Sequence, residues 1–270
     1  MKEWITGRNP VYEVVRARRR HVFRLRVASN AKMKGRLAEI VAQCTRWKIP
    51  IERVPREEIN SLGTNHQGVA LEVSGYPYQD LADILALASK QQAAPFILVL
   101  DALQDPQNLG TLLRTAEIVG VHGVILPLRR TALITPAVVN ASSGASEHLL
   151  VAQANLAQAI DRLKEAGVWV VGLEGSTDAQ PLEQVRLDGP LALVVGSEGQ
   201  GMRALVRKSC DLLLRLPMRG RVASLNAAVA GSVALYLAWQ ARGYDELPSQ
   251  PEWDGGENKH ITSIDDCPES

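Results

Sequence analysis

Three short segments of this 270-residue chain combine glycines with isolated polar side chains: DPQNLGTLLR (105–114), GSEGQGM (196–202) and LPMRGRVASLN (216–226). The middle segment has the glycine content of a phosphate loop, in which bare backbone N–H groups face an anion. However, Glu198 would repel a phosphate at close range. The G-x-x-G-x-G spacing also differs from that of phosphate loops, and there is no lysine. The segment therefore predicts a glycine-lined pocket for a ligand other than a phosphate.

The other two segments place polar residues at predicted helix starts. Asn108 is a candidate cap for a helix that carries Arg114 about a turn and a half later. Gly110 in the first turn costs stability relative to alanine, which indicates that something approaches the backbone there. Ser224 is a candidate cap for a second helix, with Asn226 in its first turn. Taken singly, each segment also fits an ordinary capped helix or a strand-to-helix turn.

The elements that would position these segments form an alternating pattern. Apolar runs of strand length recur after Pro95, with helical patterns between them, which favours a parallel sheet covered on both faces. The strands are predicted at FILVLDA, GVILPL, LLVA, VWVVGLEG, LALVVGS and LLLRLPM, and the helices at 109–119, 136–143, 155–166, 201–209 and 224–242. Ligands of such sheets bind beyond the carboxyl ends of the strands, where all three segments lie.

The front of the chain predicts a smaller α/β unit. Asn9 is a candidate cap for a helix in NPVYEVVRARR, and strand and helix patterns follow up to about Val73. We therefore divide the chain into a first domain (1–75), a linker (76–94) and a second domain (95–245). A tail (246–270) that is acidic, rich in Pro, Gly and Ser and poor in apolar residues is expected to be disordered.

Charge is distributed unevenly along the chain. Residues 1–60 carry 15 Lys and Arg against 6 Asp and Glu, whereas residues 244–270 carry 1 Lys against 8 Asp and Glu. A basic first quarter indicates a polyanionic partner, most commonly a nucleic acid. The run RARRR at 16–20 is equally compatible with the solvated face of a helix.

Several classes of protein are disfavoured by composition. Three widely spaced cysteines argue against both a disulfide framework and a zinc site, and the five histidines show no metal-binding spacing, so we expect no metal. No apolar run is long enough to cross a membrane. The N-terminal residues lack the apolar core of a signal peptide, so a cytoplasmic location is expected.

Taken together and in this order, the three segments resemble the motifs of the SpoU (TrmH-type) RNA 2′-O-ribose methyltransferases of the SPOUT superfamily. The first motif, N-x-G-x-x-x-R, and the second, G-x-E-G-x-G, are both complete. The third, I-P-M-x-G-x-x-x-S-L-N-V-S-x-A, is met except that Leu216 replaces isoleucine and Ala227-Ala228 replaces Val-Ser. GRNPVYEVV (7–15) and NHQGVALEV (65–73) are similar to the substrate-binding domain of the same family.

The resemblance implies a fold, a cofactor and a set of site residues. The fold is a small N-terminal α/β RNA-binding domain followed by a SPOUT α/β domain with a parallel sheet and a C-terminal trefoil knot. The cofactor is S-adenosyl-L-methionine, whose positive sulfonium suits a pocket without lysine, and the chain is expected to form a homodimer. The cofactor residues are Gly196, Gly201, Leu216, Met218 and Leu225, and the catalytic residues are Asn108, Arg114, Glu198, Ser224 and Asn226.

The resemblance also implies the reaction, which is methylation of a ribose 2′-hydroxyl, with a guanosine of 23S ribosomal RNA as the expected target. A transfer RNA substrate, or a non-catalytic RNA-binding protein on the same fold, is the alternative. The family proposal makes Arg114 the base. Because an arginine pKa exceeds about 12, a phosphate clamp that stabilises the developing alkoxide is the other role open to Arg114.

Overall fold

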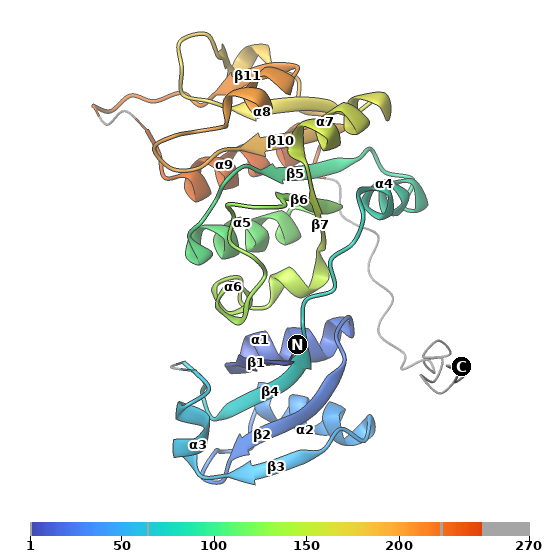
Figure 1. Ribbon diagram of the computed structural model, residues 1–270, viewed down its shortest axis with the longest axis vertical. Coiled ribbons are helices and arrows are strands. Elements are labelled where there is room, and N and C mark those ends of the chain that lie inside the picture. Colours follow the sequence, from blue (N-terminus) through green and yellow to red (C-terminus); the bar gives the residue numbers. More distant parts are fainter. Residues whose placement is uncertain (1, 64, 222–223, 245–270) are drawn as a thin grey trace, which may run out of the picture.

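The computed structural model describes residues 2–63, 65–221 and 224–244. These form two regions stacked along the long axis of the molecule (Figure 1). The first region holds a four-stranded sheet in the order β1-β4-β2-β3, in which β4 runs antiparallel to β1 and β2 and β3 runs parallel to β2. Its elements are β1 (Lys2–Thr6), α1 (Arg8–Ala17), β2 (Val22–Ala28), α2 (Arg36–Arg46), β3 (Ile51–Val54), α3 (Arg56–Asn60) and β4 (Val69–Ser74).

The start of α1 differs from the prediction. The residue that precedes the helix is Gly7, not Asn9, and no side chain caps it. Gly7 has a φ of +89°, and a Cβ atom there would lie 3.3 Å from the carbonyl oxygen of Asn65. This turn therefore depends on a glycine conformation that side chains rarely adopt. The short β1 and α3 were not predicted.

The second region is built on seven strands in the order β7-β6-β5-β10-β8-β11-β9, and every pairing is parallel. Its strands are β5 (Phe96–Leu100), β6 (Gly123–Pro127), β7 (Leu150–Ala154), β8 (Trp169–Leu173), β9 (Gln180–Pro181), β10 (Leu191–Val195) and β11 (Leu212–Arg215). All residues of β5, β6 and β10 are buried, as expected for parallel strands covered on both faces. The predicted parallel sheet and its six main strands are confirmed.

Helices cover both faces of this sheet (Figure 1). One face packs against α5 (Pro106–Ile118) and α9 (Ala227–Ala241), and the other packs against α4 (Leu81–Lys90), α7 (Leu156–Glu165) and α8 (Ala204–Ser209). Successive residues of each strand contribute to opposite faces, as the pleat requires. The remaining elements are α6 (Pro136–Ala141) and the 3-10 helices η1 (Ala145–His148) and η2 (Leu182–Gln184).

The segment predicted as a linker, 76–94, contributes α4 to the second region. The N–H of Gln79 donates to the carbonyl of Val151 at 2.9 Å, and Ile84 is fully buried. A Cβ atom at Gly123 would lie 2.6 Å from the Ile84 side chain, so α4 lies directly on β6. Much of the predicted linker is therefore packed into the core of the second region.

The run RARRR at 16–20 is exposed on a helix only at Arg16, in the last turn of α1, and does not form an open basic surface. Arg20 is only 6 % exposed and pairs with Glu147 of the second region. The Arg18 guanidinium stacks over the Trp47 ring at 3.7 Å. Most arginines of this run thus make contacts within the protein. Any contact of the first region with a polyanion must therefore use other basic residues.

The described residues contain no helix with the length and apolarity needed to span a membrane. The same residues contain no group of three His, Cys, Asp or Glu side chains placed to hold a metal ion. The predicted acidic tail, 246–270, lies outside the described residues.

Candidate active site

The first polar segment follows β5, and its helix is capped differently from the prediction. Asp105, not Asn108, precedes α5, and its carboxylate accepts the backbone N–H groups of Gln107 and Asn108 at 3.1 and 3.3 Å. Pro106 occupies the first turn, where its missing N–H costs nothing. Because the cap is provided by Asp105, the side chain of Asn108 is available for a contact elsewhere.

The second segment, 196–202, is a tight loop after β10. Ser197 and Gly201 exchange two backbone hydrogen bonds of 3.0 Å, and Gly199 and Gly201 have φ angles of +78° and +65°. A Cβ atom at Gly196 would lie 2.2 Å from the carbonyl carbon of Gly201. These glycines are therefore required by the closure of the loop itself, which presents Glu198 to solvent.

The end of this loop is fixed to the neighbouring strand. Asp101, fully buried after β5, accepts the backbone N–H and the Nε–H of Arg203, both at 2.7 Å. The charged hydrogen bonds compensate the burial of the carboxylate. This contact holds the loops after β5 and β10 side by side.

The third segment leads into α9, and here the predicted cap is also wrong. Asn226, not Ser224, precedes the helix, and its Oδ1 accepts the N–H groups of Ala228 and Val229 at 2.9 and 3.1 Å. The helix begins at Ala227, so Ser224 lies too early to reach its free N–H groups. Ser224 lies on the pocket wall, and its catalytic role stays a prediction.

The three segments meet through side chains. Asn108 Nδ2 donates to Glu198 Oε1 at 2.7 Å, and Asn226 Nδ2 donates to the same carboxylate oxygen and to Asn108 Oδ1, the latter at 3.2 Å. A single carboxylate thus receives two amide donors from two different helices. Asn226 both caps α9 and joins this cluster, which fixes its side chain on two sides.

A pocket of about 640 Å³ opens beside the cluster at the carboxyl ends of β8, β10 and β11. Its lining includes all five predicted cofactor residues, Gly196, Gly201, Leu216, Met218 and Leu225, and also Glu198, Ser224 and Asn226. Asn108 and Arg114 are not among the lining residues. The roles of all these residues stay predictions.

One side of the pocket was missed by the sequence prediction. Leu173, Glu174, Gly175 and Ser176 follow β8 and line the cavity. β8 lies between β10 and β11 in the sheet, so its carboxyl end must face the same space. The signal in the sequence was the Glu-Gly pair that ends the strand pattern VWVVGLEG.

The pocket lining is unusual in its charge. Among the described residues it contains two carboxylates, Glu174 and Glu198, but no Lys, Arg or His. The Nε of Arg207 lies 3.4 Å from Glu174 Oε2, which partly offsets the first charge. Such a lining disfavours a phosphate and suits a ligand with apolar parts and a positive charge.

Arg114 lies further along α5, outside the pocket. Its side chain is exposed, and Nη1 donates to Ser143 Oγ at 3.2 Å. Gly110, one turn earlier, lies against the end of α6, because a Cβ there would be 2.4 Å from Ala141 Cβ and 2.9 Å from Ser142 N. The predicted close approach at Gly110 is therefore confirmed, and its partners are the Ala141 side chain and the backbone at Ala141 and Ser142.

The fold and this cluster define an α/β protein with the three motifs of one enzyme family at the same edge of its parallel sheet, after β5, β10 and β11. The chain belongs to the SpoU rRNA methylase family, whose model matches residues 95–236. A second model, described as RNA 2′-O ribose methyltransferase substrate binding, matches residues 4–79. The predicted resemblance is thereby confirmed.

Relatives and solved structures agree. A Bacillus subtilis protein named for the TrmH family of tRNA/rRNA methyltransferases, YacO, is 42% identical over 245 residues, which cover 89% of this chain and 96% of that one. A Staphylococcus saprophyticus protein named for the same family is 40% identical over 244 residues, with coverage of 89% and 96%. The fold is similar to the crystal structure of the SpoU methyltransferase AviRb from Streptomyces viridochromogenes in complex with AdoMet, with a TM-score of 0.76, 22% identity and coverage of 91% and 92%.

Proposed function

We propose that this chain transfers a methyl group from S-adenosyl-L-methionine to a ribose 2′-hydroxyl of RNA. The observation that carries the proposal is the cluster of Asn108, Glu198 and Asn226 at the rim of the pocket. The family model over 95–236 and the substrate-binding model over 4–79 support it, as do the names of the relatives.

The pocket suits this cofactor. Its apolar wall, which includes Leu173, Leu216 and Leu225, can hold an adenine ring, and the backbone of the glycine loop offers polar groups at the floor. When bound, S-adenosyl-L-methionine supplies a methyl group on a positively charged sulfur, which the carboxylate-containing lining tolerates. Calorimetry should show one cofactor site per chain that survives a chelator, because we propose no metal. Loss of binding on chelation would contradict the proposal.

We assign Arg114 to the RNA rather than to the cofactor. It is exposed and lies outside the pocket lining, and a guanidinium binds phosphate through two parallel N–H donors. Since an arginine pKa above about 12 resists proton loss, we favour a role in which Arg114 binds a phosphate and stabilises the developing oxyanion. Asn108 and Asn226 would hold Glu198 in place beside the ribose.

The proposed target is a guanosine of 23S ribosomal RNA, and a transfer RNA is the second candidate because the relatives are named for both substrates. We infer a cytoplasmic location from such substrates, which cell fractionation can test. The decisive experiment is nucleotide-resolution mapping of 2′-O-methylation in total RNA with and without the protein. A site in 23S RNA that disappears supports the first target, and one in transfer RNA supports the second. No change at any site would favour a non-catalytic RNA-binding protein.

Two further features are proposed from the family resemblance. The first is a trefoil knot in the C-terminal part of the second region, which tracing the backbone in an experimental structure will test. The second is a homodimer. Val229, Val233 and Tyr236 form one exposed apolar face of α9, at 48%, 41% and 45% exposure, and a second copy would cover it. Sedimentation at micromolar concentration should give the mass of a dimer, and a monomer would contradict this.

We also propose that the first region, with its excess of basic residues, grips the RNA while the second region does the chemistry. Phosphate contacts make RNA affinity dependent on salt. Charge-reversing substitutions at Lys32 and Lys34, both exposed, should weaken RNA binding and reduce its salt dependence. Unchanged affinity would exclude that loop from the RNA contact.

A further inference from the structure

The hydrogen bond from Arg114 ends on a residue that none of the three motifs contains. Ser143 Oγ accepts from Arg114 Nη1 at 3.2 Å and is half-buried. Ser143 has a φ of +55°, in the left-handed region, and Gly144 follows with +90°. The N–H groups of these residues bond to Asn140 and Val139 at 3.0 and 2.8 Å, which closes the end of α6. The turn that aims this hydroxyl is therefore a defined but unfavourable conformation for a serine.

The same turn lies against the first region. A Cβ atom at Gly144 would be 2.6 Å from Glu13 Cβ and 3.2 Å from Pro10 Cα, both of which belong to α1. Four residues on, His148 Nε2 lies 2.8 Å from Glu13 Oε2. The segment 142–149 is thus held between α1 of the first region and α5 of the second, because Gly110 of α5 packs on Ser142.

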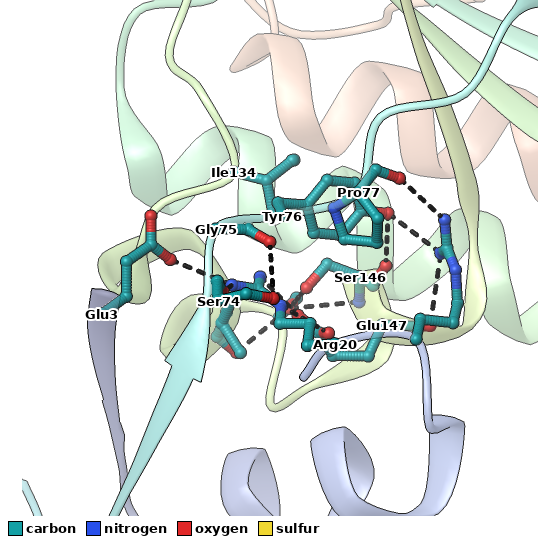
Figure 2. Close-up of polar contacts among 12 residues, drawn as sticks. Glu3, Arg20, Ser74, Gly75, Tyr76, Pro77, Ile134, Ser146 and Glu147 are labelled. Carbon is teal, nitrogen blue, oxygen red and sulfur yellow. Dashed lines mark hydrogen bonds and ion pairs between the residues drawn. The ribbon is translucent and has the colours of Figure 1, made fainter. Parts of the chain in front are cut away.

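A buried ion pair strengthens this contact (Figure 2). Arg20 Nε and Nη2 donate to the two carboxylate oxygens of Glu147 at 2.9 and 2.8 Å, and these side chains are 0% and 1% exposed. Arg20 Nη1 also donates to Glu3 at 2.9 Å and to the carbonyl of Ser74 at 3.2 Å. Because each charged group has hydrogen-bond partners, separating the regions would leave costly unpaired groups.

Backbone carbonyls of the segment also accept hydrogen bonds from Arg19 of the first region and from Tyr76, which follows β4. The buried Tyr76 hydroxyl lies 2.9 and 2.8 Å from the carbonyl oxygens of Ser146 and Leu149, and shares its one proton between them. Arg19 Nη1 donates to the carbonyls of Glu147, at 3.3 Å, and Leu149. Figure 2 shows Tyr76 and Arg20 beside Ser146 and Glu147 of this stretch. The path of 142–149 therefore depends both on Arg19 of the first region and on Tyr76, which follows β4.

We propose that Ser143 is a positioning residue for Arg114. The position of Ser143 is in turn set by the docking of the first region through the Arg20–Glu147 ion pair. The inference rests on the proposed function of Arg114. It implies that the region that grips the RNA and the arginine that meets the reacting ribose are held in one rigid frame. Substrate contact and reaction geometry are then coupled through the segment 142–149.

Substitutions of Ser143 in the full chain test the first step. Ser143→Gly removes the hydroxyl but suits the positive φ, so folding is retained, and Ser143→Asn tolerates this φ and restores an acceptor oxygen. We expect Ser143→Gly to lower kcat for RNA methylation by about tenfold or more, as loss of one charge-assisted hydrogen bond implies. KM for RNA and cofactor affinity should stay within about twofold, and Ser143→Asn should recover most of the rate. In an Arg114→Ala background, Ser143→Gly should cause no further loss of the single-turnover rate.

The second step is tested by Arg20→Met/Glu147→Met, which replaces the directional hydrogen bonds of the ion pair by apolar side chains of similar size. Glu3, whose side chain is 18% exposed, loses its contact with Arg20 in this variant. Arg186→Ala, which breaks an exposed ion pair with Asp188, is the control. The double variant should lose kcat as Ser143→Gly does, and the control should not. NMR relaxation of the Arg114 guanidinium provides a readout independent of activity. The Arg114 guanidinium should show restricted motion in the wild type and greater motion in Ser143→Gly and in the double variant.

The outcomes separate this inference from the proposed function. If the wild type methylates RNA but Ser143→Gly does so at the same rate, the inference is overturned and the function stands. If the wild type methylates no RNA, the function fails, and the order of the Arg114 guanidinium alone decides the inference. Equal mobility of the Arg114 guanidinium in the wild type and in all variants overturns the inference, whether or not the wild type methylates RNA.

Discussion

The side-chain amide of Asn108 donates a 2.7 Å hydrogen bond to the carboxylate of Glu198, 90 residues further along the chain. The contact joins the first turn of α5, which follows β5, to the loop after β10, and β5 and β10 are adjacent strands. Asn226 donates to the same carboxylate from the start of α9. One acidic side chain is thus the meeting point of all three polar segments.

Arg114→Ala should lower the single-turnover rate of methyl transfer by about 100-fold or more, the scale of losing a donor to a developing negative charge. Cofactor affinity, measured by calorimetry, should change by less than about threefold, because Arg114 lies outside the pocket lining. Arg114→Lys should recover little, since lysine lacks the planar fork. A matching loss of cofactor binding would show that Arg114 has a structural role instead.

Asn226 can be tested by separating its two contacts. Asn226→Ala removes the cap of α9 and should cost about 1 kcal/mol of stability. Asn226→Asp keeps a capping oxygen but loses the donor to Glu198 and places a second carboxylate beside it. We expect both variants to lose methyl transfer, and thermal unfolding to show that Asn226→Asp retains the cap. A fully active Asn226→Asp enzyme would mean that the bond to Glu198 is dispensable.

Gly110→Ala should destabilise the protein by about 1–3 kcal/mol, because the new methyl group would overlap Ala141 and the backbone at Ser142. Gly189→Ala is the matched control, since a Cβ there meets nothing within 4 Å, and should change stability by less than about 0.5 kcal/mol. Urea unfolding of both variants measures the difference. Equal stability would show that α5 can move away from α6 at little cost.

Glu13 makes the contact between the two regions sensitive to acid. Burial alone would raise the pKa of its carboxyl group, but the hydrogen bond and positive charge of His148 outweigh this, with help from Arg16 and Arg36. The pKa of Glu13 is therefore below its usual value. A carboxyl group of this kind adds stability above its unfolded-state pKa, and the gain is lost as the pH falls through the folded-state pKa.

We therefore expect Glu13→Gln to be less stable than the wild type near pH 7, and this difference to shrink between about pH 5 and pH 3. Denaturant unfolding of both proteins at several pH values measures it. Comparing the two cancels the titration of all other carboxyl groups. Parallel stability profiles over this range would show that Glu13 does not contribute through its charge.

Much of the second region could be predicted from the sequence, because its signals are local. Continuous apolar runs predict buried parallel strands, and β5, β6, β7, β8, β10 and β11 lie where these runs do. The motif order then placed Asn108, Glu198 and Asn226 at strand ends. Residue type and spacing suffice for such inferences, since they report on the period of each element and on its capping residues.

Helix caps were less predictable, although they too are local. Asp105 and Asn108, or Ser224 and Asn226, are both acceptable caps by residue type. The residue that caps each helix depends on where the chain leaves the preceding strand. In the structure, Asp105 caps α5 and Asn226 caps α9. Because Asn108 does not cap the helix, its side chain can donate a hydrogen bond to Glu198.

Only the tertiary structure decided which distant segments share a site. Residues 173–176 line the pocket because β8 lies between β10 and β11, an order that the chain sequence does not display. Likewise, the packing of the two regions buries Arg20 against Glu147. The packing of α5 beside the end of α6 lets Arg114 donate a hydrogen bond to Ser143. The sequence by itself determined the elements and the chemistry available at their ends. The packing of elements against one another determined which side chains contact each other. A buried ion pair or a close backbone contact forms only when both packed surfaces are in place.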